Sequence, residues 1–230
     1  MLSPLQRRQA ITFCVTWIVY ASSYMLRKPL GVIKSDLQTN YKLTKNQLGW
    51  LDTSFFLPYA LVQIIVGNLG DKYGAALVIK INCLIIGLSM ISFGFWDSPV
   101  IFAILLFFNG AGQAALWPNC VKSLSAWYSN AKLATIFGLW GTCMFVGGIF
   151  GTGLAVRLQA LYVPDLKMIF VVPSLIVLVV AVIVHLFLST PEEMDIVVEG
   201  KPPQVDYYYK LGVVRNTKSN NMIRILLHTV

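Results

Sequence analysis

Six apolar runs divide the chain, each about as long as a helix that crosses a lipid bilayer, and the charged residues gather between them. The runs cover residues 9–33, 48–69, 75–96, 99–121, 133–156 and 168–188. Of all residues, 57% are hydrophobic and 12% are charged, whereas a soluble domain carries roughly a quarter charged residues. A single soluble core could not enclose this much apolar surface. The sequence therefore predicts an all-α membrane protein whose main partner is the lipid bilayer.

Charge and cysteine content exclude several classes of function. The net charge is +8, but the basic residues lie in short loops and form no continuous basic helix, which argues against a nucleic-acid partner. The four cysteines form no CxxC pair and no Cys/His metal spacing. The runs also contain no nucleophile–base set and no paired carboxylates. We therefore expect no metal, no cofactor and no enzymatic activity.

The composition predicts three segments. Residues 1–188 form a six-helix membrane unit, and residues 189–221 form a polar linker that contains three prolines. Residues 222–230 are apolar but too short to span, so they are either a truncated seventh helix or an interfacial segment. Lys and Arg are more numerous in the segments on the side of both termini, which favours cytoplasmic N- and C-termini.

A charged glycine motif follows the second run. Gly67, Asp71, Lys72 and Gly74 form the pattern G-x-x-x-D-K-x-G. Glycines allow a tight turn and the aspartate can accept from a basic residue, so the pattern predicts a conformational latch between helix ends. An ordinary solvated turn is the alternative. The motif resembles the loop between helices 2 and 3 of the major facilitator superfamily. The six runs resemble one half of that fold, which consists of 3+3 inverted repeats.

The first run presents a candidate anion-binding face. Tyr20, Tyr24 and Arg27 are spaced i, i+4 and i+7, so they share one side of a helix. An arginine inside a span is costly in lipid and should face a polar space, and its planar guanidinium matches phosphate oxygens. We therefore expect Arg27 to bind substrate, with the two hydroxyls as further donors. Lys28 and Lys34 are instead expected to snorkel toward the membrane interface.

Three blocks of residues resemble one family within that superfamily. Residues 24–34 read Y-x-x-R-K-P-x-x-x-x-K, similar to the first helix of the organophosphate:phosphate antiporters, in particular the eukaryotic sugar-phosphate exchangers of the solute carrier 37 type. Residues 109–128 and 138–148 resemble the family's fourth and fifth helices. The resemblance implies exchange of a phosphorylated sugar or similar organophosphate for inorganic phosphate by alternating access. It favours the endoplasmic reticulum membrane for a eukaryotic chain.

The resemblance also implies roles for polar residues in the other runs. Asn109, Gln113 and Trp117, spaced i, i+4 and i+8, lie along one face of the fourth run and are candidate substrate-binding residues. Trp117 matches a family tryptophan near the substrate. Packing remains the alternative for both Trp117 and Gln113. Gln63 of the second run stands where bacterial members have a lysine in the cavity, and it is a candidate substrate-binding residue. Met144 stands where they have a histidine, so a histidine-dependent step is not carried over.

Only one six-helix half is present, whereas alternating access needs two halves that rock around the site. We therefore expect a truncated transporter whose partner is a second half or a second copy of the chain. The alternative is a non-transporting membrane subunit or truncated regulatory isoform of such a transporter.

Overall fold

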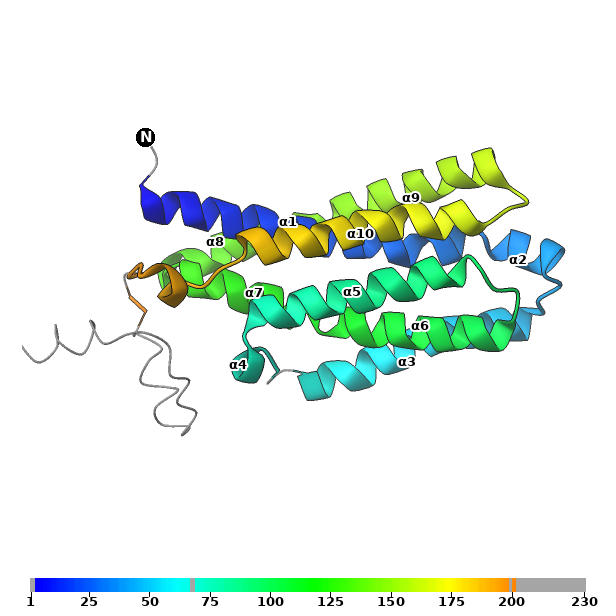
Figure 1. The fold of residues 1–230 in the computed structure, drawn as a ribbon, viewed down its shortest axis with the longest axis horizontal. Helices are drawn as coiled ribbons and strands as arrows, with labels where there is room; N and C mark the ends of the chain where they lie inside the picture. Colours follow the sequence, from blue (N-terminus) through cyan, green and yellow to red (C-terminus); the bar gives the residue numbers. More distant parts are fainter. Residues whose placement is uncertain (1–2, 67–68, 199, 202–230) are drawn as a thin grey trace, which may run out of the picture. The chain divides into compact units, whose positions relative to one another are not determined.

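A computed structural model of the protein describes residues 3–66, 69–198 and 200–201. The helices in this part are α1 (Pro4–Val32), α2 (Lys34–Asn40), α3 (Lys45–Ile65), α4 (Leu69–Tyr73), α5 (Ala75–Phe93), α6 (Pro99–Ala114), α7 (Leu116–Trp127), α8 (Asn130–Trp140), α9 (Thr142–Tyr162), α10 (Lys167–Phe187) and the 3₁₀ helix η2 (Glu192–Met194). The beginning of α1 and the end of α10 lie at one end of the bundle, opposite α2 (Figure 1). The expected apolar segment 222–230, and the linker from residue 202 onward, lie outside the described residues.

The predicted number of membrane spans is confirmed. Within the described residues, six helices or helix pairs are long and apolar enough to cross a membrane: Pro4–Val32, Lys45–Ile65, Ala75–Phe93, Pro99–Trp127, Asn130–Tyr162 and Lys167–Phe187. Several spans extend beyond the apolar runs by a few residues, because polar capping residues and amphipathic ends continue the helix past the lipid-like segment. Thr44, for example, caps α3 in a capping box with Gln47.

The fourth and fifth spans are each built from two helices. The fourth breaks at Ala115, between α6 and α7. Pro118 lacks a backbone N–H and cannot donate to the carbonyl of Ala114 four residues earlier, which accounts for the break. The fifth breaks at Gly141, between α8 and α9, where glycine is a weak helix former.

Glycines bring α9 directly against α1. A Cβ carbon added at Gly147 would lie 2.8 Å from the Cα of Ala21, and one added at Gly151 would lie 3.0 Å from the Cα of Met25. Two backbones this close leave no room for side chains between them. Gly147 and Gly151, spaced i and i+4, thus form a small-residue contact of the kind that lets helices approach closely in lipid.

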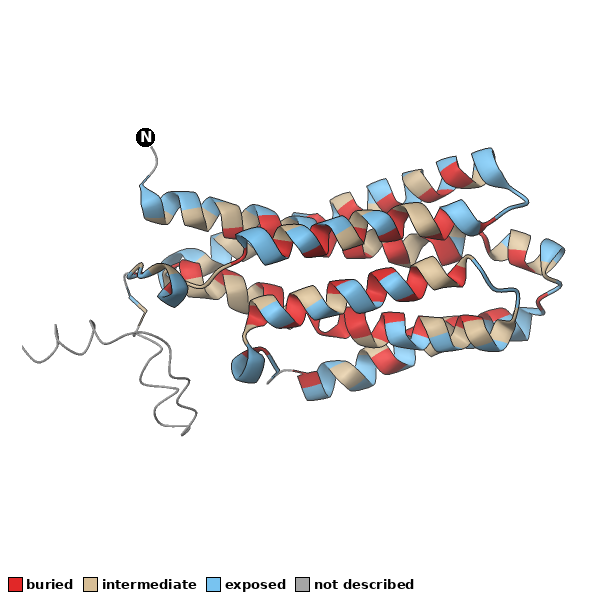
Figure 2. Cartoon of the chain, viewed as in Figure 1, coloured by how far each residue is buried: buried red, intermediate tan, exposed pale blue. Residues whose placement is uncertain are grey.

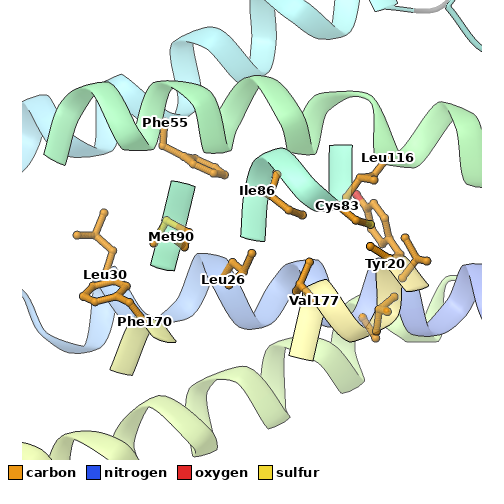
Figure 3. Close-up of a cluster of buried hydrophobic side chains, with 14 of the residues drawn as sticks. Tyr20, Leu26, Leu30, Phe55, Cys83, Ile86, Met90, Leu116, Phe170 and Val177 are labelled. Carbon is orange, nitrogen blue, oxygen red and sulfur yellow. The ribbon is translucent and has the colours of Figure 1, made fainter. Parts of the chain in front are cut away.

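The apolar core lies where α1, α5 and α10 meet. Leu26, Ile86 and Val177, one from each helix, gather there with Met90 and Phe170 (Figure 3), and all five are almost fully buried. This core holds α1 in place along the part that carries Arg27.

Two spans are much less buried than the rest. In the most apolar stretches of α3 and of the α8–α9 pair, 22% and 17% of residues are buried, against 44–50% in the other four spans. Large apolar side chains such as Ile64, Phe145 and Ile149 are more than 70% exposed on these helices. Their outer faces appear as pale blue turns in Figure 2. These faces are available for lipid or for another membrane-spanning element.

The short helix α2 contacts both of these less buried spans, at the end of the bundle opposite the N-terminus. Lys34 forms an ion pair of 2.5 Å with Asp52 of α3, and Gln159 of α9 donates a hydrogen bond of 2.5 Å to Asp36. Leu37, which directly follows Asp36 on α2, is buried. Lys34 therefore pairs within the protein, whereas the sequence had suggested that it snorkels outward.

Candidate anion-binding site

Arg27 lies near the end of α1, and its guanidinium reaches between α3 and α6. Its carbon Cζ is 4.6 Å from the ring centre of Tyr24, 5.0 Å from that of Tyr59 and 5.9 Å from that of Phe55. Cation–π contacts of this kind contribute about 0.5–2 kcal/mol each. The faces of these three aromatic rings thus stabilise the guanidinium charge, which would be costly in lipid alone.

The guanidinium is only partly supplied with hydrogen-bond acceptors. Its Nε donates to Oε1 of Gln113 on α6. Its Nη2 is buried and has no hydrogen-bond partner among the described residues. In the same part of the chain, the two recorded ion pairs join other residues, so no carboxylate neutralises Arg27 there. A buried, positively charged donor without an acceptor is suited to an anionic ligand that brings its own oxygens.

Tyr20 and Tyr24 lie beside Arg27 on α1, as their spacing predicts. Their rings are 5.7 Å apart, and the Tyr20 ring also packs 5.0 Å from Trp117 and 5.5 Å from Trp140. Trp140 donates from Nε1 to Thr16 at 3.1 Å. This aromatic cluster closes the side of the site that faces the N-terminal end of α1. Trp117 contributes to it through packing with Tyr20.

Gln113 and Asn109 both lie on α6 with fully buried side chains. Gln113 contacts Arg27 directly, whereas Asn109 hydrogen-bonds to Gln113 and to α5. Asn109 was expected to touch substrate, but its complete burial places it behind Gln113 instead.

Gln63 lies away from the Arg27 guanidinium. It lies on α3 one turn beyond Tyr59, its side chain is exposed, and no contact with Arg27 is recorded in the described part of the chain. The residues of α3 that do face Arg27 are Phe55 and Tyr59, which the sequence analysis missed. Their spacing with Gln63 (i, i+4 and i+8) was the available signal, since it marks one helix face.

Lys28 lies on another side of α1 from Arg27. Its Cε is 3.5 Å from a Cβ position built at Gly148, and its Cγ is 3.3 Å from one built at Gly151. The stem of Lys28 therefore runs along the glycine face of α9, which differs from the expected outward snorkelling.

The glycine motif after the second span forms a charged contact, and its partner comes from another span. Asp71 of α4 pairs with Lys122 of α7, whereas Lys72 lies over the ring of Tyr73 at 5.1 Å. Gly74 has φ +86°, a left-handed conformation that favours glycine. Gly67 lies outside the described residues.

If the pair acts as a latch, we expect Asp71→Asn to change the rate at which the helix bundle moves between conformations several-fold, while leaving the melting temperature nearly unchanged. The Asp71 and Lys122 side chains are 49% and 30% exposed, so the pair contributes less than about 1 kcal/mol to stability. Loss of the ion pair should instead change how fast the helices move between conformations. NMR relaxation measurements on the protein in lipid nanodiscs give this rate. The charge swap Asp71→Lys with Lys122→Asp should restore part of the rate. An unchanged rate in Asp71→Asn would rule out a latch.

The Arg27 guanidinium lies among α1, α3 and α6 in a bundle of six candidate membrane spans, and a charge held inside such a bundle is typical of the ligand or ion pathway of a membrane transport protein. The family model described as "Major Facilitator Superfamily" matches residues 13–226. The chain therefore belongs to the Major Facilitator Superfamily.

Curated relatives confirm the resemblance to carriers of phosphorylated solutes. The chain is 28% identical over 229 residues to the "Glucose-6-phosphate exchanger SLC37A2" of Bos taurus, covering 85% of this chain and 45% of the relative. It is 31% identical over 132 residues to the "Membrane sensor protein UhpC" of Escherichia coli (strain K12), covering 57% and 30%. It is 26% identical over 220 residues to the "Putative glycerol-3-phosphate transporter 1" of Arabidopsis thaliana, covering 80% and 42%. The chain thus spans about half the length of these relatives, or less.

A solved structure supports the fold. The crystal structure of a bacterial homolog to the human lysosomal transporter Spinster, inward-facing and unoccupied, superposes with a TM-score of 0.75 at 16% sequence identity. The match covers 92% of this chain and 50% of that one. The arrangement of helices is therefore that of half a major facilitator transporter.

Proposed function

We propose that this chain is one six-helix half of a secondary transporter that exchanges a phosphorylated sugar or similar organophosphate for inorganic phosphate. The observation that carries the proposal is the Arg27 guanidinium, which is held between aromatic rings with a buried Nη2 that has no partner among the described residues. The names of the relatives support a phosphorylated solute. A transport role rather than a catalytic one agrees with the fold.

The geometry supports a simple mode of binding. Gln113 engages Nε, so the Nη groups of Arg27 are left to donate to phosphate oxygens. A doubly charged phosphate gains most from a guanidinium in a site of low polarity, because the surrounding rings screen the charges poorly. The hydroxyl of Tyr24, on the same face of α1, is a candidate further donor.

Alternating access would then require a second six-helix unit on the exposed faces of α3, α8 and α9, either a second half or another copy of the chain. The even number of candidate spans in the described part of the chain agrees with its first and last described residues on one side of the membrane, and we propose that both termini are cytoplasmic. By analogy with the exchangers we propose the endoplasmic reticulum as the location in a eukaryotic cell.

The test is exchange in liposomes loaded with radioactive phosphate, using the protein alone and the protein joined to the second half of a relative. We expect external glucose-6-phosphate to release the label when two halves are present. The proposal fails if no label is released when two halves are present.

A second candidate function is that of a membrane sensor that binds a phosphorylated solute without moving it. The similarity to a protein named as a membrane sensor favours this possibility. A sensor would bind phosphate through Arg27 yet release no label even when two halves are present. The same liposome assay, combined with a binding measurement, therefore separates the two functions.

A further inference from the structure

We propose that Asn109 and Ser89 are positioning residues for anion binding, which act through Gln113 on the Arg27 guanidinium. This inference rests on the proposed function. Neither residue is placed to touch a ligand, since Asn109 is 0% exposed and Ser89 is 7% exposed. Together with Gln113 they form a chain of hydrogen bonds that runs from the backbone of α5, through α6, to α1.

This series of hydrogen bonds is continuous, and the bonds from α5 to Gln113 are buried. Gln113 donates from Nε2 to Oδ1 of Asn109 at 2.7 Å. Asn109 donates from Nδ2 to the carbonyl of Ile86 at 3.1 Å and to the hydroxyl of Ser89 at 3.3 Å. Ser89 itself donates to the Ile86 carbonyl at 3.0 Å. Both amides therefore have their polar groups engaged inside the helix bundle.

The Ile86 carbonyl, at the α5 end of this hydrogen-bond series, determines which way each amide faces. The Ile86 carbonyl can only accept, so the NH2 group of Asn109 must face α5 and its oxygen must face Gln113. That oxygen in turn holds the NH2 group of Gln113, which leaves the Gln113 oxygen directed at Arg27. The network thus presents an acceptor, and not a donor, to the guanidinium.

This orientation has a consequence for the anion. The Gln113 oxygen holds Nε and so restricts how the guanidinium can turn, while Nη2 keeps no partner among the described residues. Without Asn109, the Gln113 amide could rotate and turn its NH2 group toward Arg27, which repels a cation. The guanidinium would then lose its fixed orientation, and phosphate would bind more weakly although no residue in contact with it had changed.

The test compares phosphate binding by the purified protein in lipid nanodiscs for Asn109→Leu, Asn109→Asp and the control Asn82→Leu. Asn82 of α5 donates to the Val78 carbonyl within its own helix and has no recorded contact with Arg27. We expect Asn109→Leu to weaken phosphate binding roughly 10-fold, as loss of a fixed orientation implies. Asn109→Asp should stay within a few-fold of the unaltered protein, because a buried, protonated carboxyl can replace both the donor and the acceptor. Asn82→Leu should leave the affinity unchanged.

A second variant keeps the inference testable if Asn109→Leu does not fold. Gln113→Glu preserves shape but places a carboxyl against Arg27. Its phosphate affinity, taken relative to the unaltered protein at each pH, should rise as the pH falls, because protonation removes the competing negative charge. Equal affinity of Asn109→Leu and the unaltered protein, or a pH-independent ratio for Gln113→Glu, would overturn the inference. Absence of phosphate binding by the unaltered protein would instead overturn the proposed function.

Discussion

Replacing Arg27 with alanine is expected to weaken phosphate binding by ~100-fold and to abolish exchange. The charge-assisted hydrogen bonds that a guanidinium makes contribute about 1.5–3 kcal/mol, and the site has no other cation among the described residues that faces the same aromatic rings. Arg27→Lys should lose most of the affinity as well, because an ammonium cannot donate to Gln113 and to two phosphate oxygens in one plane. Phosphate titration of the purified protein measures both effects.

Arg157 offers a matched control for this prediction. Arg157 lies on α9 with an exposed side chain, away from the site. Arg157→Lys and Arg157→Ala therefore remove a guanidinium from the same protein without altering the site. Both should bind phosphate normally. If Arg27→Ala binds phosphate as tightly as the Arg157 variants do, the anion is held elsewhere.

Gly110→Ala is expected to destabilise the protein and to disrupt the site from a distance. A Cβ carbon at Gly110 would lie 3.0 Å from the carbonyl carbon of Phe55 and 3.3 Å from its Cα, and closer still to its oxygen. Because these are backbone atoms, α3 must move away from α6, which costs about 1–3 kcal/mol. The movement would draw Phe55 and Tyr59 away from the guanidinium. Thermal unfolding and phosphate affinity should therefore both fall.

The contrasting substitution is Gly153→Ala on α9. Nothing lies within 4 Å of a Cβ built there, so the alanine should be tolerated and should stabilise the helix by about 0.5–1 kcal/mol. The comparison isolates close packing from the general effect of glycine in helices. Equal melting temperatures for the two variants would show that α3 and α6 are not in backbone contact.

The spans were predictable because lipid imposes a length and a composition that can be read along one stretch of chain. The face formed by Tyr20, Tyr24 and Arg27 was predictable for a similar reason, since helical spacing alone places these residues side by side. The breaks at Ala115 and Gly141 were harder to foresee, because proline and glycine are also tolerated within uninterrupted spans. Proline inside α1 and α10 is an example.

Contacts between spans were not predictable from one sequence. The approach of Phe55 and Tyr59 to Arg27 depends on how α3 is shifted and rotated against α1, which no local pattern records. The pairing of Asp71 with Lys122 has the same origin, since these residues are 51 positions apart. Periodicity placed Asn109 on the same face as Gln113, but it could not show that one side chain lies behind the other.

The most direct measurement of the central claim is solid-state NMR of the protein in lipid, with nitrogen-15 arginine and bound inorganic phosphate. Dipolar coupling between phosphorus and a guanidinium nitrogen reports direct contact. We predict coupling from a single arginine that disappears in Arg27→Lys and persists in Arg157→Lys. Coupling that survives in Arg27→Lys, or its absence when phosphate is bound, would contradict the assignment of Arg27 as the anion-binding group.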